Sequence, residues 1–267
     1  MTPPRILCYH KVDRRAELGV TRLSPRRFAR QIERLAGGGC STLSLEQLRA
    51  CLTGVRRAAP HDIAITFDDG YRALRDYAFP VLSAHGFTAI CFVVTDYAGK
   101  LNRWDVAYGG RRFAHLAWRD MRRWQSRGIE FASHTATHPR LTWLDDGGVA
   151  RELSRSRAAI RDALDVDSAA VSWPFGAHAE REHRIAKREG YALAFTIGGA
   201  STWSGDLFAV PRHPVYAWSP STPAFGTLAQ LDSCAGAIAN RCAVGTSIIR
   251  RVTRPNSAQG VSRTAPS

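Results

Sequence analysis

Two short segments of the chain combine carboxylates and imidazoles in a pattern that suits a divalent metal. Asp68, Asp69 and Gly70 end a run of apolar residues, and His134 and His138 lie four residues apart in Ser-His-Thr-Ala-Thr-His. That spacing places both imidazoles on one side of a helical turn. One carboxylate and two imidazoles give three protein ligands and leave positions open for water and substrate. The sequence therefore predicts a metal-assisted hydrolase.

The two adjacent acids can hold different roles. Side chains alternate across a strand, so Asp68 and Asp69 point in different directions at its end. One can bind the metal while the other remains ionised and accepts protons, and Gly70 permits a tight turn out of the strand. A lone Asp-Asp-Gly is more often an acidic turn. Because the two histidines also follow a strand-like run, the combination favours a functional site.

Strand-like and helical segments alternate along the chain. Apolar runs predict strands at 6–9, 63–67, 89–94, 129–132, 169–173 and 193–197, and an edge or irregular strand with two prolines at 208–215. Apolar residues at helical spacing predict helices after Ser24, at 78–84, 119–126, 149–164 and 180–189, and a last one at 228–239. This order and the chain length favour an α/β fold with a parallel (β/α) barrel, whose active site lies at the carboxyl ends of the strands.

Three motifs resemble those of a known family. Thr-Phe-Asp-Asp-Gly (66–70), Ser-His-Thr-Ala-Thr-His (133–138) and Trp-Pro-Phe-Gly (173–176) are similar to the first three motifs of the NodB-type polysaccharide deacetylases, carbohydrate esterase family 4. The resemblance extends from the first strand to Val215. It implies a distorted (β/α) barrel of the NodB-homology type and a divalent metal, usually zinc, with cobalt, nickel or iron as alternatives. It also implies deacetylation of N-acetylated amino sugars in an exopolysaccharide or cell-envelope glycan.

The resemblance also assigns roles to individual residues. Asp68 would be the catalytic base, and Asp69, His134 and His138 would hold the metal. The base would take a proton from the attacking water. The backbone N–H of Phe175 would stabilise the oxyanion together with the metal.

The general acid departs from the usual family pattern, because the late histidine in a leucine-rich motif is absent. Tyr9-His10-Lys11-Val12 instead resembles the N-terminal Tyr-His segment of the poly-N-acetylglucosamine deacetylase branch. His10 is therefore the expected acid, with His213 as the alternative. A histidine hydrogen-bonded at the barrel rim is the structural alternative for both.

A second departure concerns the arginine that usually precedes the third motif and pairs with the base. Residues 170–173 contain no arginine. One hypothesis is that Arg212 supplies the charge from a neighbouring strand; if nothing replaces it, the pKa and orientation of Asp68 would differ from the family pattern. Arg212 and His213 are also candidates for substrate contacts. Trp104, in an aromatic-rich insertion, is a third candidate because it could stack on a sugar.

The composition limits the partners. A formal charge of +14 invites a nucleic-acid hypothesis, but the excess is arginine scattered over helical faces without a nucleic-acid-binding motif. We expect no nucleic-acid partner and interpret the charge as a solvated basic surface, with attraction to an anionic membrane surface or an acidic glycan as the alternative. The six cysteines form no CxxC pair, so a cysteine-ligated zinc site is not expected.

The chain organisation is that of a single domain. We predict one deacetylase domain over 1–250 and a disordered polar tail over 251–267. No stretch of 18 apolar residues indicates a membrane span, and the N-terminus lacks the pattern of a secretory signal, so a cytoplasmic location is expected.

Two other functions fit the same motifs. A deformylase of a lipid-linked amino sugar would suit a basic protein attracted to membranes. A degenerate family member could bind a glycan without cleaving it, which the missing motif arginine would permit.

Overall fold

The computed structural model describes residues 4–15, 21–102, 112–198, 203–217 and 219. The helix predicted at 228–239, the predicted domain boundary at 250 and the predicted tail at 251–267 lie outside these residues. Within the described part, no helix is long and apolar enough to cross a membrane.

The strands form one parallel sheet of eight members. They are β1 (Arg5–Tyr9), β4 (Ser41–Thr42), β5 (Asp62–Phe67), β6 (Ala89–Val93), β7 (Ile129–Ser133), β8 (Ala170–Ser172), β9 (Leu193–Phe195) and β10 (His213–Pro214). Their order is β10-β1-β5-β6-β7-β8-β9, with β4 paired to β5. A separate parallel pair joins β2 (Lys11–Val12) to β3 (Arg22–Leu23). This is the predicted parallel α/β architecture.

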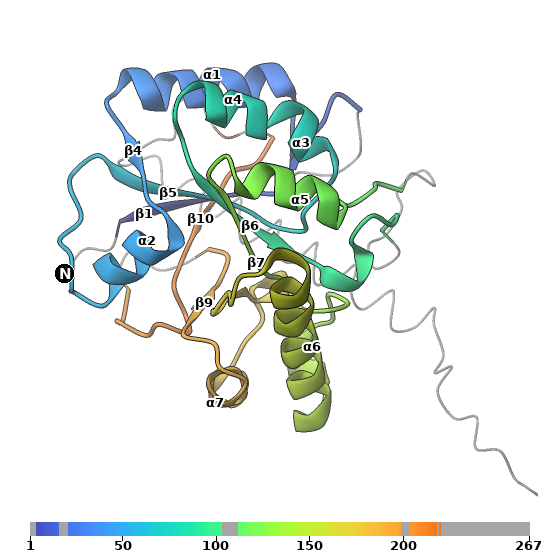
Figure 1. Ribbon diagram of the computed structural model, residues 1–267. Coiled ribbons are helices and arrows are strands. Elements are labelled where there is room, and N and C mark those ends of the chain that lie inside the picture. Colours follow the sequence, from blue (N-terminus) through green and yellow to red (C-terminus); the bar gives the residue numbers. More distant parts are fainter. Residues whose placement is uncertain (1–3, 16–20, 103–111, 199–202, 218, 220–267) are drawn as a thin grey trace, which may run out of the picture.

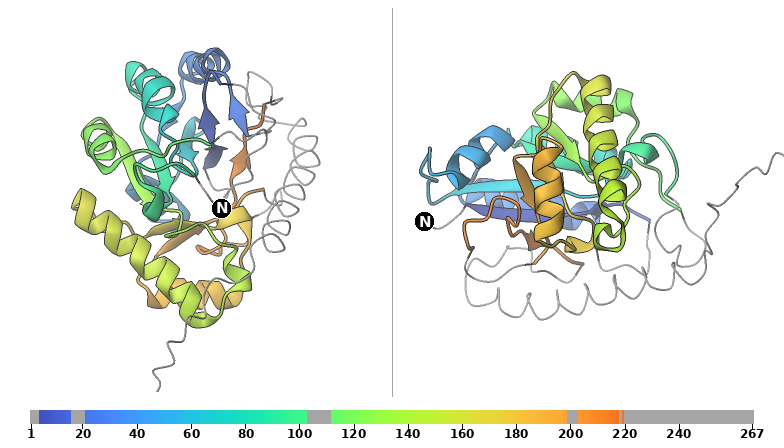
Figure 2. Two further views of the ribbon diagram at one scale, coloured as in Figure 1. Left: turned by 90° about the vertical axis from the view of Figure 1, so that its right-hand side faces the viewer. Right: turned by 90° about the horizontal axis from the view of Figure 1, so that it is seen from below.

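The structure describes seven helices, most of which lie outside the curved sheet (Figures 1 and 2). They are α1 (Pro25–Gly37), α2 (Leu45–Leu52), α3 (Ala73–Tyr77), α4 (Phe79–Ala84), α5 (Trp118–Gln125), α6 (Asp146–Leu164) and α7 (Glu180–Arg188). Short 3₁₀ turns follow three of the strands: η1 (Thr95–Tyr97), η3 (Leu141–Trp143) and η4 (Pro174–Gly176). Ser24 and Asp145 cap α1 and α6 by accepting hydrogen bonds from backbone N–H groups of the first turn.

Two helical features differ from the predictions. α2 was not predicted, although Ser44 and Gln47 form a capping box at its start. The helix predicted at 78–84 is confirmed as α4, but the short helix α3, which precedes it and meets it at Ala78, was not predicted. The break precedes Pro80, which has no backbone N–H to continue a helical hydrogen-bond ladder.

Residues 210–215 close the sheet between its first and last strands. Val210 pairs with Phe195 at the end of β9, and the backbone N–H of Thr196 donates to the Val210 carbonyl at 2.9 Å. β10 then pairs with β1, and the Val215 N–H donates to the Cys8 carbonyl at 2.8 Å. The segment is irregular, as its prolines predicted, but it is not an edge, because it has a neighbour on each side. The result is a distorted (β/α) barrel.

Alternation along the strands separates two packing layers. Outward residues such as Tyr9 and Phe67 pack with Phe28 of α1 and Phe79 of α4 in one aromatic cluster. The inward residues form a second cluster in the barrel interior: Ile6, Ala64, Ile90, Phe92, Ala132, Ala170, Phe195 and Val210. Leu48 and Leu52 of α2 belong to this inner cluster. The next inward positions toward the carboxyl ends of β5, β8 and the closing segment are polar, and they build the site.

Candidate active site

Asp69, His134 and His138 converge at the carboxyl ends of β5 and β7. The Asp69 Oδ1 atom lies 3.5 Å from Nε2 of His134 and 3.6 Å from Nε2 of His138. One ligand atom from each side chain fits within a group whose members are all within 4.8 Å of one another, and all three residues are buried. One carboxylate and two imidazoles form a common donor set for zinc and similar divalent metals. The residues present therefore fit the predicted metal.

A backbone contact orients one of the two imidazoles. The Nδ1 atom of His134 lies 2.8 Å from the Ser172 carbonyl oxygen, so Nδ1 carries the proton and donates it. Nε2 is then directed toward Asp69, with which it pairs when the ring is protonated, and its lone pair is available to a metal when the ring is neutral. Such a contact behind the ligand fixes both the tautomer and the ring direction in metal sites.

The backbone is left-handed at several residues of the site. Positive φ angles occur at Asp69 (69°), Thr135 (66°), His138 (59°) and Phe175 (61°), where side chains rarely adopt them. Gly70 follows with a φ of 65°, and a Cβ there would lie 2.8 Å from the Val93 Cγ1 atom. Such conformations cost of order 1–3 kcal/mol each and gather at functional sites. The sequence motif alone did not predict them.

Arg212 forms a buried bidentate ion pair with Asp68. Its Nη1 atom donates to Asp68 Oδ1 and its Nη2 atom to Oδ2, both at 2.7 Å. The same guanidinium donates to Ser172 Oγ at 2.7 Å, to Thr66 Oγ1 at 3.2 Å and, through Nε, to the Thr196 carbonyl at 3.2 Å. Asp68 is 0% and Arg212 1% exposed. Arg212 thus contacts Asp68 as the sequence suggested, and its burial removes it from the predicted substrate-contacting residues.

The ion pair determines the charge of Asp68. Burial by itself would raise the pKa of this carboxyl group, but the charge of Arg212 and then that of His134 outweigh burial and hold the pKa well below its usual range. Burial opposes ionisation of Asp69 in the same way, and its hydrogen bond to His134 and the charge of His138 lower its pKa to about 2. Both acids are therefore carboxylates at neutral pH, one facing the histidines and one facing Arg212.

His10 follows β1 and lies beside Asp68. A nitrogen of His10, Cys8 Sγ and an Asp68 oxygen lie within 4.8 Å of one another. Burial lowers the pKa of His10, although Asp68 and Asp69 oppose this shift. The His10 Nδ1 atom is buried without a hydrogen-bond partner among the described residues. His10 is therefore positioned as the sequence predicted, next to the carboxylate proposed as the base.

The remaining predicted residues lie in different places. His213 is exposed and occupies the strand position next to the inward-pointing Arg212, so it faces away from Asp68 and does not join the site. The Phe175 ring packs against that of His138 with centroids 4.7 Å apart, which places the third motif beside the histidines. Trp104 lies outside the described residues.

Two contacts escaped the sequence predictions. Glu152 of α6 accepts hydrogen bonds from the Thr137 N–H at 2.8 Å and from the Thr137 hydroxyl at 2.7 Å, which holds the loop between His134 and His138. The Ser172 hydroxyl oxygen accepts a hydrogen bond from the Arg212 guanidinium, and the Ser172 carbonyl oxygen accepts one from His134 Nδ1. Glu152 lies within a helix and Ser172 within a strand, and neither belongs to a recognisable motif, so the sequence did not identify them as site residues.

A family-wide comparison matches residues 56–194 to the family described as polysaccharide deacetylase. The chain belongs to this family. The matched segment contains Asp68, Asp69, His134, His138 and Phe175, and it ends before Arg212. Polysaccharide deacetylases hydrolyse N-acetyl amide bonds, so the protein is a hydrolase of this class.

Two curated deacetylase relatives align with most of the chain. YxkH of Bacillus subtilis (strain 168), whose own assignment as a polysaccharide deacetylase is provisional, is 26% identical over 208 residues, which are 78% of this chain and 69% of that protein. The poly-β-1,6-N-acetyl-D-glucosamine N-deacetylase of Escherichia coli (strain K12) is 23% identical over 209 residues, or 67% of this chain. Those residues span only 31% of the E. coli protein.

Solved deacetylase structures share the fold. The Streptococcus pyogenes deacetylase PplD, in complex with acetate, superposes with a TM-score of 0.73 at 22% identity over 87% of this chain and 99% of that one. IcaB from Ammonifex degensii gives a TM-score of 0.71 at 21% identity, over 89% of this chain and 97% of that one. At these identities the likeness establishes the barrel, and the assignment of each residue rests on the geometry above.

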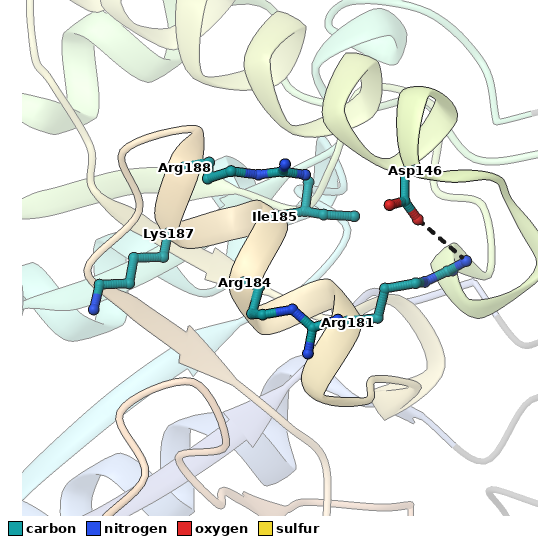
Figure 3. Close-up of a pocket in the computed structure, with 6 residues that line it drawn as sticks. All are labelled: Asp146, Arg181, Arg184, Ile185, Lys187 and Arg188. Carbon is teal, nitrogen blue, oxygen red and sulfur yellow. Dashed lines mark ion pairs between the residues drawn. The ribbon is translucent and has the colours of Figure 1, made fainter.

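The basic surface predicted from composition includes a hollow between α6 and α7 (Figure 3). It is lined by Asp146, Arg181, Arg184, Ile185, Lys187 and Arg188. An ion pair of 3.7 Å joins Arg181 to Asp146. The suggested association with an anionic membrane surface stays a prediction.

Proposed function

We propose that this protein is a divalent-metal-dependent N-deacetylase of an N-acetylated amino sugar within a poly- or oligosaccharide. One observation carries the proposal: a carboxylate held ionised by a buried arginine, Asp68, adjoins a second carboxylate that meets two histidines. Hydrolysis of an unactivated amide needs a base for water, stabilisation of the oxyanion and an acid for the amine. The site offers residues for each of these tasks.

Asp69, His134 and His138 are the residues that would hold the cation. When bound, a divalent metal supplies Lewis-acid polarisation of the acetamide carbonyl and lowers the pKa of the attacking water. Zinc suits this donor set, and cobalt, nickel and iron use the same ligand types.

The protein's own residues would move the protons. Asp68 accepts one proton from the attacking water, and Arg212 keeps it ionised until then. The backbone N–H of Phe175 is the proposed donor to the oxyanion. His10 donates a proton to the nitrogen as the C–N bond breaks, so acetate and the amino sugar leave. The Tyr9-His10 segment supports placing the protein near the poly-N-acetylglucosamine deacetylases, and the E. coli relative is named for that activity.

The proposal is tested by acetate release from N-acetylglucosamine oligomers by the zinc-loaded protein, with N-formyl analogues assayed in parallel. We expect acetate release that a chelator abolishes and added zinc restores. A preference for N-formyl substrates by orders of magnitude would support the deformylase instead. Glycan binding without any turnover would support a degenerate member of the family.

His134→Ala tests the metal ligand, with His85→Ala as the control because His85 is exposed at the end of α4. The first variant should lose bound metal and activity together, and the second should keep both. Metal bound equally by both variants would reject the assigned site.

A further inference from the structure

A hollow of about 570 Å³ lies beside the candidate active site, on the loops that follow β6 and β7. Asp96, Tyr97, Lys100, Leu101, Arg112 and Thr137 line it. Its size falls within the roughly 300–1,000 Å³ of small-ligand sites. No step of the proposed reaction uses these residues.

Backbone hydrogen bonds join this hollow to both ligand-bearing loops. The Thr95 and Asp96 N–H groups donate to the carbonyls of Thr135 and Ala136, at 3.3 and 3.0 Å. Thr137, which lines the hollow, directly precedes His138. The hollow and the candidate metal ligand His138 are therefore adjacent along the chain.

Lys100, another lining residue, is connected to Asp69 through His115. The N–H of His115 donates to the Lys100 carbonyl at 2.9 Å, and His115 Nδ1 lies 2.7 Å from the Asp69 carbonyl oxygen. Lys100 is thus held through one residue against the other ligand-bearing loop. The hollow is part of the same rim as the site.

The charge of the hollow is positive. Asp96 is paired with Arg155 at 2.7 Å, and Glu152, whose oxygens both accept hydrogen bonds from Thr137, is not part of the lining. Lys100 donates to the Asp96 carbonyl oxygen at 2.8 Å, which fixes its position without cancelling its charge. Among the residues described in the structure, no carboxylate pairs with Lys100 or Arg112. Two cations without a carboxylate partner in the described part of the chain therefore line the hollow.

Apolar groups complete the lining. Tyr97 offers part of an aromatic ring, and Leu101 is 51% exposed, which is unusual for a large hydrophobic side chain. A pyranose ring presents C–H groups to such a surface while its substituents reach polar groups at the edge. A carboxylate is the substituent that ammonium and guanidinium groups bind most directly.

We infer that the substrate is an acidic glycan, in which a uronic acid next to the N-acetylated sugar occupies this hollow and its carboxylate contacts Lys100 and Arg112. The inference rests on the proposed deacetylase function and adds its substrate class. The formal charge of +14 supports it, because a strongly basic protein attracts polyanions and raises their association rate. The two cations would also repel the ammonium group of a deacetylated neighbour.

The test compares two oligosaccharides of equal length: alternating glucuronic acid and N-acetylglucosamine, and the same chain with its carboxyl groups reduced to alcohols. We expect kcat/KM for acetate release to be about tenfold higher for the acidic chain at low salt. The difference should become smaller at about 0.5 M salt, because dissolved ions screen the attraction between the protein and the carboxylates. N-acetylglucosamine oligomers are assayed alongside.

The double variant Lys100→Glu/Arg112→Glu should reduce this ratio to about one or below. Lys187→Glu/Arg188→Glu is the matched control, since it changes the net charge equally at the carboxyl end of α7. That end of a β/α helix lies far from the carboxyl ends of the strands, where the site is. The control should retain a preference for the acidic chain.

The outcomes separate this inference from the proposed function. Equal rates on the acidic and reduced chains, or the same loss in the control as in the hollow variant, would overturn the inference. Turnover of N-acetylglucosamine oligomers alone would overturn it while the deacetylase function stands. Failure of the zinc-loaded protein to release acetate from any of the three would overturn both.

Discussion

Arg212 and Asp68, 144 positions apart in the chain, meet in a two-fold hydrogen-bonded ion pair inside the barrel. Each brings a charge that would be costly alone in the interior, and each neutralises the other. The pair packs against two aromatic rings: the guanidinium carbon of Arg212 lies 5.2 Å from the Phe92 ring centroid and 5.9 Å from that of Phe195. The base of the proposed reaction is therefore held both ionised and immobile.

Replacing Asp68 with Asn tests the base. Asn cannot take a proton from water, so kcat should fall by about 10²–10⁴, while bound zinc should remain at one per chain. The change also leaves the Arg212 charge unpaired, and we expect a loss of roughly 3 kcal/mol in the free energy of unfolding. Amine release, metal content and denaturant unfolding measure the three effects.

Asp167→Asn is the control for this prediction. Asp167 pairs with Arg157 at 2.6 Å, but its side chain is 58% exposed, so solvent screens the pair. It should change neither activity nor, by more than about 1 kcal/mol, stability. Activity retained in Asp68→Asn would contradict the assignment of the base.

Replacing Arg212 with Met tests how the charge of Asp68 is set. Burial then raises the pKa of Asp68 without the opposing arginine. The acid limb of the kcat/KM profile should move to higher pH, because the base must be ionised to act. Arg212→Lys keeps a charge but loses the bidentate geometry, so its limb should lie between those of the wild type and Arg212→Met. Identical acid limbs in all three proteins would show that Arg212 does not control the base.

Replacing His10 with Gln tests the general acid. His10 must be protonated to serve the leaving amine, so the wild-type rate should fall as the pH rises through its pKa, which burial lowers. His10→Gln should reduce kcat by about 10²–10⁴ and lose this basic limb. His213→Gln is the matched control because His213 faces outward. If His213→Gln were the slower variant, the two histidines would exchange roles.

Replacing Glu152 with Gln tests the support of the ligand loop. The carboxylate accepts two hydrogen bonds from Thr137, and an amide retains only one acceptor oxygen. We expect zinc affinity to weaken by about 10–100-fold, the effect typical of contacts behind metal ligands. A competition titration with a chromogenic chelator measures it, and the exposed Glu180→Gln serves as control. Unchanged affinity would mean that the loop holds its shape without Glu152.

The amino-acid sequence by itself indicated most of the fold and the ligand set. The acids at the end of a strand and the His-x₃-His segment are local patterns that the sequence displays directly. The alternation of strands with helices indicates a parallel sheet, in which the carboxyl ends of the strands lie at one edge. α2 was missed because eight residues carry a weak periodic signal, although its capping box is readable.

The partner of the base and the loop clamp depended on tertiary structure. The sequence offered Arg212 as a hypothesis, and closure of the barrel by residues 210–215 brings it to Asp68 and turns His213 outward. Left-handed backbone at Asp69 and His138, and the Glu152 clamp, likewise arise where separate segments pack together. Contacts between residues this distant in the chain leave no local sequence pattern, because they depend on how separate segments pack in three dimensions.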